Sequence, residues 1–77
     1  MKLSVFMSTC FRAQAGPWLK WDHDTLRGKV KFLVVFEDLC TGFEAHEDEE
    51  HEHVLNELFW LHTKLKAASA VAKALTS

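Results

Sequence analysis

Alternating apolar and polar positions predict three strands in the first half of the chain. Residues 2–12 place an apolar or β-branched side chain at every second position, which is typical of a strand with one better-buried face. Residues 18–21 form a short apolar segment that is long enough for a second strand. The clearest pattern lies at 29–37, where alternate residues from Val30 to Phe36 are all apolar. Apolar residues also occupy the other face there, so we expect an interior strand.

The second half of the chain predicts one long helix. No glycine or proline follows Gly42, and apolar residues recur at alternating intervals of four and three up to Leu75. Thr41 and Glu44 have the spacing of a capping box, whereas the acids near residue 48 would also suit a helix N-terminus. We therefore expect the helix to begin within residues 42–48.

Together these elements predict an α+β fold, in which a three-stranded antiparallel sheet is followed by one long C-terminal helix (β-β-β-α). The length of 77 residues leaves room for one domain with one core. We expect a single domain over residues 1–77, with the sheet in 1–41 and the helix in 42–77.

The expected helix is longer than the sheet that it covers. A helix of about 28 residues extends ~42 Å, whereas strands of about eight residues span ~27 Å. The last three turns therefore reach past the sheet while keeping their apolar stripe, so we expect this part of the helix to bind a second copy of the chain. The predicted interface of the homodimer consists of Leu58, Leu61, Leu65, Ala68, Ala72 and Leu75.

Charge is strongly segregated along the chain, although the formal net charge is only −2. Residues 1–31 carry six cations and two acids, whereas residues 32–57 carry nine acids and no cation. The total charge selects neither nucleic acid nor membrane as a partner, but the acidic middle predicts a local negative surface.

This acidic segment is the main candidate for a binding surface. We expect about 25 Å between it and Lys29 and Lys31, because the predicted helix follows the far end of their strand. That separation exceeds the Debye length of ~8 Å at physiological salt, so the segment would act independently on a protein partner with a basic surface. Tryptophan side chains would add affinity. The predicted partner-binding residues are Glu44, Glu47, Asp48, Glu49, Glu50, Glu52, Trp18 and Trp21.

A metal site is a second interpretation of the same segment. His46, Glu50 and His53 would share one face of a helix, and imidazole with carboxylate suits Zn²⁺, Ni²⁺, Mn²⁺ or Fe²⁺. An acidic, hydrated helix start is the better explanation, because the run lacks two histidines at i, i+4 with a third ligand. We therefore expect no tight metal site and no cofactor, and keep metal or pH sensing as a third hypothesis for the function.

Nucleic-acid binding is the alternative function. Trp18 and Trp21 alternate with cations in a basic hairpin that could stack bases and neutralise phosphates. No recognised nucleic-acid motif accompanies them, so we do not expect nucleic acid as the partner. Motifs for nucleophilic catalysis or phosphate binding are also missing from the sequence, and we predict that the protein is not an enzyme.

The two cysteines, Cys10 and Cys40, are too few for a disulfide framework, and we expect two buried, reduced thiols. The sequence shows neither a signal peptide nor a run of ~18 apolar residues, which predicts a cytoplasmic protein. In size, expected layout and charge segregation the chain is similar to many small phage-encoded accessory and inhibitor proteins, including anti-CRISPR proteins. This similarity implies a small inhibitor that binds another protein, in the host cytoplasm if the chain is viral.

Overall fold

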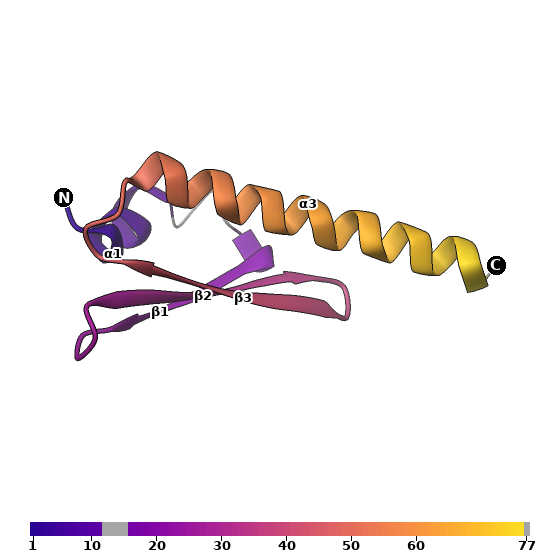
Figure 1. Cartoon of the computed structure of the whole chain (residues 1–77), viewed down its shortest axis with the longest axis horizontal. Coiled ribbons are helices and arrows are strands. Elements are labelled where there is room, and N and C mark those ends of the chain that lie inside the picture. The colour runs from indigo at the N-terminus through magenta and orange to yellow at the C-terminus, as the bar shows by residue number, and fades with distance from the viewer. Residues whose placement is uncertain (12–15, 77) are drawn as a thin grey trace.

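The computed structural model describes residues 1–11 and 16–76, and it confirms the α+β class (Figure 1). A short helical segment precedes a three-stranded antiparallel sheet, and a long C-terminal helix packs on that sheet. The elements are α1 (Leu3–Phe6), the π-helical turn η1 (Met7–Phe11), the 3-10 turn η2 (Gly16–Trp18), β1 (Leu19–Asp24), β2 (Lys29–Phe36), β3 (Leu39–His46) and α3 (His51–Thr76).

The interior strand of the prediction is confirmed. β2 lies between β1 and β3 and pairs antiparallel with both. Its alternate residues Val30, Phe32 and Val34 are at most 3% exposed and face the helical layer. The opposite face of the sheet is open to solvent among the described residues, since Lys31 is exposed and Leu33 is 39% exposed. The core therefore lies on one side of the sheet.

The segment predicted as the first strand is helical instead. Leu3, Met7 and Phe11 are buried and lie four residues apart, so they share one helical face. Val5 would share that face in a strand, yet it is 46% exposed. A spacing of four satisfies a period of two as well as a helical repeat, which is why alternation predicts the wrong element here. Residue 12, the last of the predicted strand, lies outside the described residues.

The residues after β2 form a third strand, where the sequence predicts the start of the helix. Thr41 and Glu44, which have the spacing of a capping box, both lie within β3. A two-residue turn joins the strands, and its first residue, Glu37, has a positive φ of 56°. α3 begins only at His51, so the predicted division between sheet and helix at residue 41 is wrong.

α3 packs along β2 and β3 through the first part of the predicted apolar stripe. Val54 and Leu58 are fully buried, and Leu61 and Leu65 pack against the core. Farther along, Ser69 is only 5% exposed, because the β2–β3 turn reaches the helix there. The turn also contacts Lys73, one helical turn beyond Ser69, so the overhang is shorter than the three turns predicted (Figure 1). In the part of the chain that the structure describes, no helix is long and apolar enough to cross a membrane.

Candidate functional site

The predicted acidic surface is divided by the fold into buried, paired and exposed residues. Glu44 lies at the end of β3, where its carboxylate is 3.8 Å from the ammonium of Lys29. Glu49 accepts a long hydrogen bond of 3.5 Å from the backbone N–H of His46. Glu47 is buried at 6% exposure, so the expectation that the whole segment is exposed is wrong for this residue.

Glu47 is buried because it caps the N-terminal helix. Its carboxylate accepts hydrogen bonds from the backbone N–H and the hydroxyl of Ser4, at 2.9 and 2.8 Å. Its backbone carbonyl accepts a bond from the N–H of Leu3, and its own N–H donates to the carbonyl of Gly28. A single residue thus joins α1, the β1–β2 turn and the end of β3.

His23 lies at the edge of this cluster, with its side chain 32% exposed and Nε2 3.4 Å from Oε2 of Glu47. Serine, histidine and glutamate are the residue types of a hydrolytic triad, but here the serine and the histidine both contact the carboxylate of Glu47. The Ser4 hydroxyl donates to the carboxylate, whereas a nucleophilic serine must give its proton to the histidine. The geometry is that of a helix cap supported by an imidazole.

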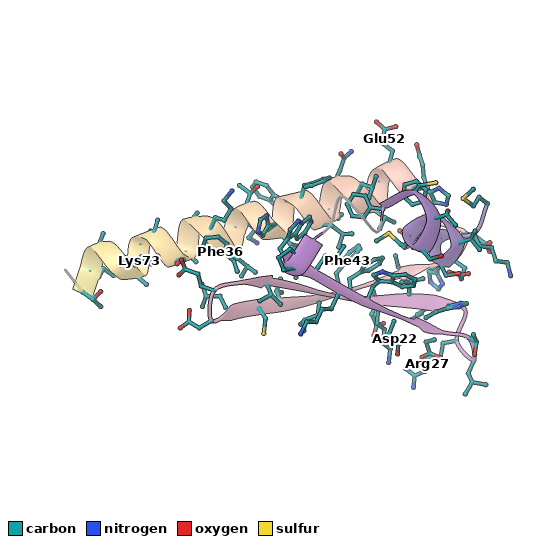
Figure 2. All side chains as sticks on the ribbon, turned by 180° about the vertical axis from the view of Figure 1, so that it is seen from behind. Asp22, Arg27, Phe36, Phe43, Glu52 and Lys73 are labelled. Carbon is teal, nitrogen blue, oxygen red and sulfur yellow. The ribbon has the colours of Figure 1, made fainter. Side chains whose placement is uncertain are left out.

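Three acids remain exposed where β3 leads into α3, and we call Asp48, Glu50 and Glu52 the acidic cluster. None of them forms an ion pair with the residues that the structure describes. Glu52 lies in the first turn of α3 and points away from the sheet (Figure 2). The backbone that carries the cluster is held by two bonds, from Glu49 N–H to the carbonyl of His46 and from Val54 N–H to the carbonyl of Glu50.

The predicted separation of about 25 Å between the acidic segment and Lys29 and Lys31 is wrong. Because β3 turns back along β2, Lys31 lies opposite Glu44 and Lys29 lies opposite His46. The ammonium of Lys31 is also 3.7 Å from the carboxylate of Asp24. The cations of the hairpin are thus partly neutralised by Glu44 and Asp24 within the sheet.

Trp18 and Trp21 serve mainly to cover the core. Trp18 stacks on His62 with ring centroids 4.5 Å apart and contacts Phe59 at 5.5 Å. Trp21 lies opposite Phe32 on the face of the sheet that packs against the helices. Both tryptophans are partly buried, so the structure does not place them as an open stacking platform beside the hairpin cations.

The environment of His62 affects its charge. Burial against these aromatic rings lowers the pKa of His62, and the nearby Lys66 lowers it further. The ring of Phe36 meets the imidazole edge-on, at 5.8 Å between centroids. A neutral imidazole suits this apolar setting.

The three candidate metal ligands do not share a helical face. His46 is the last residue of β3, Glu50 precedes the helix, and only His53 lies within α3. Among the described residues, no group of three histidine, cysteine, aspartate or glutamate side chains is positioned to hold a metal ion. The prediction that these three residues share one face of a continuous helix is therefore wrong.

The predicted dimer interface is divided between core and surface. Leu58 is fully buried against its own sheet, and Leu61 and Leu65 pack against the same core. Ala68, Ala72 and Leu75 are exposed. Two further apolar residues of α3, Trp60 at 58% and Val71 at 59% exposure, are exposed but are not among the six residues of the predicted interface.

Both cysteines, Cys10 and Cys40, are exposed free thiols, contrary to the prediction that they are buried. Cys40 lies on the open face of the sheet, opposite Val35 of β2.

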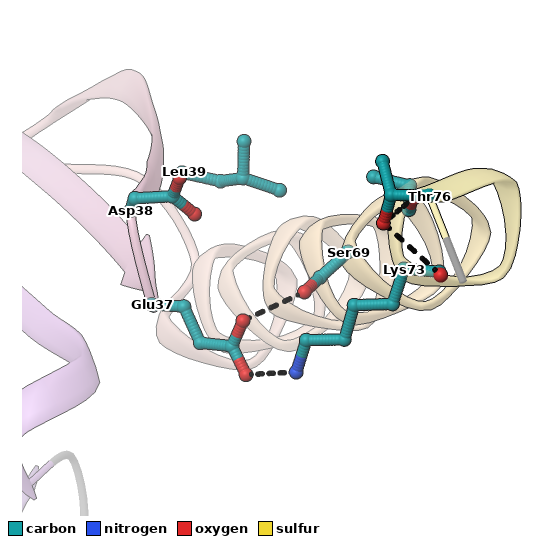
Figure 3. Close-up of a pocket in the computed structure, with 7 residues that line it drawn as sticks. Glu37, Asp38, Leu39, Ser69, Lys73 and Thr76 are labelled. Carbon is teal, nitrogen blue, oxygen red and sulfur yellow. Dashed lines mark hydrogen bonds and ion pairs between the residues drawn. The ribbon is translucent and has the colours of Figure 1, made fainter.

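A shallow cavity of about 290 Å³ lies where the β2–β3 turn meets α3 (Figure 3). Glu37 accepts hydrogen bonds from the Ser69 hydroxyl at 2.9 Å and from the Lys73 ammonium at 2.7 Å. The hydrogen bond from Lys73, followed by that from Ser69, lowers the pKa of Glu37. These bonds use the polar groups at the cavity wall to hold the turn on the helix.

We searched for relatives of this chain: no protein-family model, curated protein or solved structure matches it.

Proposed function

We propose that this protein is a non-enzymatic binding protein that inhibits another protein by covering a basic surface. The acidic cluster would dock on that surface, which in the partner receives nucleic acid or another anion. The observation that carries the proposal is the grouping of Asp48, Glu50 and Glu52 on a short, hydrogen-bonded connection, exposed and without an ion-pair partner among the described residues.

The location of the cluster supports a role in recognition. The Glu47 cap and the backbone bonds around Glu49 hold the connection in place, so little conformational entropy is lost when it binds. Acids at this end also interact favourably with the N-terminal dipole of α3. A preorganised negative surface raises the rate of encounter with a basic partner and determines its orientation.

The first experiment compares capture of proteins from a lysate of the source host by the wild-type protein and by a triple variant, Asp48→Asn/Glu50→Gln/Glu52→Gln. We expect a basic protein to be retained by the wild type at 0.15 M salt, and its retention to fall at least tenfold in the variant. Higher salt should slow association, because screening weakens the attraction between the two surfaces.

A matched variant changes the charge equally at other exposed or half-buried acids: Asp22→Asn/Asp38→Asn/Glu57→Gln. We expect this control to retain the partner. The captured protein should lose its own binding to nucleic acid or another anion when the wild-type protein is added. Retention of the partner by the acidic-cluster variant would contradict the proposal, as would capture that leaves the partner's anion binding intact.

A further inference from the structure

His62 of α3 lies where three elements of the fold meet. Its imidazole stacks on the indole of Trp18 from η2, with ring centroids 4.5 Å apart and an angle of 21° between the ring planes. The ring of Phe36, at the end of β2, meets the same imidazole edge-on at 5.8 Å. Phe59, one turn earlier in α3, contacts Trp18 at 5.5 Å. A titratable ring is thus part of the aromatic contact between η2 and α3.

The charged groups around His62 do not compensate for a proton on its imidazole. Lys66 lies one turn farther along α3 and contributes another positive charge. η2 contains no charged residue. Beyond the end of β2, the carboxylate of Glu37 accepts hydrogen bonds from Ser69 and Lys73, two to three turns along the helix from His62. Among the described residues, no carboxylate lies within ion-pair distance of this imidazole.

A proton on His62 therefore weakens the contact in which the imidazole takes part. Burial against the aromatic rings lowers the pKa of His62 below its ordinary value of 6.5, and Lys66 lowers it further. The packed arrangement thus favours the neutral imidazole, whereas an arrangement in which water reaches the ring accepts the proton more readily. The contact keeps its full stability above pH 6.5 and loses stability as the pH falls through the lowered pKa.

We propose that His62 is a pH-sensitive contact, which holds η2 on α3 while the imidazole is neutral and releases it in mildly acidic solution, when the imidazole takes up a proton. Release gives the imidazolium access to water and exposes the apolar rings of Trp18 and Phe59. The change is local, because the fully buried Val54 and Leu58 pack on the sheet without a titratable partner in the core. The sheet and α3 therefore stay together while η2 separates.

This contact lies away from the acidic cluster, so the inference does not depend on the proposed binding function. Glu52, the member of the cluster within α3, precedes His62 by ten residues, or about 15 Å along the helix. His23 responds to acid in the opposite sense, because a proton on its imidazole adds an ion pair with Glu47 at 3.4 Å. The histidines must therefore be followed one by one.

Nuclear magnetic resonance of the full chain between pH 8 and pH 5 tests the proposal, with the resonances of the five histidines resolved separately. The imidazole of His62 should titrate with a midpoint below 6.5. Nuclear Overhauser effects between the rings of His62 and Trp18 should be strong at pH 7.5, since the ring centroids are 4.5 Å apart. They should fall at least about twofold at pH 5, as the population shifts to the open arrangement.

His62→Phe keeps an aromatic ring that cannot take up a proton, so the indole resonances of Trp18 should no longer change between pH 7.5 and pH 5. His53→Phe is the matched control at an exposed histidine of the same helix, and it should keep the wild-type response. The proposal is overturned by persistent His62–Trp18 Overhauser effects at pH 5, or by an acid response that remains in His62→Phe. A wild-type midpoint at or above 6.5 also overturns it, because cation–π attraction to the indole then outweighs burial. The two wild-type measurements decide the matter even if His62→Phe does not fold.

Discussion

Glu47 illustrates how one acid can be structural within a segment of exposed acids. Its carboxylate replaces water as the acceptor for the Ser4 N–H and hydroxyl, while both groups are buried. Removing it leaves buried donors without an acceptor, a loss that costs about 1–3 kcal/mol. We therefore expect Glu47→Ala to lower the unfolding midpoint by about 5–20 °C in thermal denaturation followed by circular dichroism.

Glu50→Ala is the control for this prediction, because Glu50 is an exposed acid three residues away. It should change the midpoint by no more than about 3 °C, since exposed substitutions are usually within ±0.5 kcal/mol. Equal effects of the two substitutions would mean that Glu47 does not cap the N-terminal helix in solution.

Glu37 links protonation to the contact between the β2–β3 turn and α3. Its pKa is lowered by the hydrogen bonds from Lys73 and Ser69, so the folded state favours the ionised carboxylate. The resulting stabilisation is present at neutral pH and is lost as the pH falls below the ordinary value of 4.5 and through the lowered pKa. We expect Glu37→Gln to be slightly less stable than the wild type at pH 7 and equally stable at pH 2.

Denaturant unfolding of both proteins at pH 7 and pH 2 measures this difference. Lys73→Gln should reduce stability at pH 7 in the same way, and the double variant should lose little more than either single variant, because both substitutions break one interaction. A difference between wild type and Glu37→Gln that persists at pH 2 would show that the carboxylate charge is not responsible.

At the scale of elements, the sequence correctly predicts those whose patterns are unambiguous. The alternation from Val30 to Phe36 fits only a strand, and the apolar stripe of the C-terminal half extends over too many turns to be anything but a helix. Leu3, Met7 and Phe11 fit either period, and the local sequence does not decide between them. The helix is selected by tertiary contacts, namely the Glu47 cap and the stacking of Phe6 on His51 at 4.5 Å between ring centroids.

β3 was missed for a related reason. Gly42 weakens the strand pattern, and Thr41 with Glu44 has the spacing of a helix start, so local signals favour the wrong element. The strand forms because the two-residue turn returns the chain to β2, whose backbone groups need partners on both sides. The same error placed Glu44 and His46 in a helix. Because they lie in β3 instead, the expected metal-binding face does not form, and acids lie close to Lys29 and Lys31.

At the scale of the whole molecule, the short N-terminal segment is a part of the core. Leu3, Met7 and Phe11 are three of the ten buried hydrophobic residues among those described, and the Phe11 ring meets Phe59 of α3 edge-on at 5.9 Å. Truncating one such side chain to alanine typically costs 2–5 kcal/mol, whereas a chain of this length has a total stability of about 4–12 kcal/mol. The sheet and α3 alone therefore lack the burial that a stable fold needs.

We predict that Met7→Ala destabilises the protein about as much as Leu58→Ala, because both side chains are fully buried in the same core. A chain that lacks residues 1–11 should show no cooperative unfolding transition by circular dichroism, since it loses three core side chains and leaves Glu47 without its Ser4 donors. Val5→Ala, at a residue that is 46% exposed, is the control for a merely local effect and should cost less than about 1 kcal/mol. If the shortened chain unfolds cooperatively with wild-type stability, then the N-terminal segment is an attachment to an independent domain, and the burial of Met7 contributes nothing to folding.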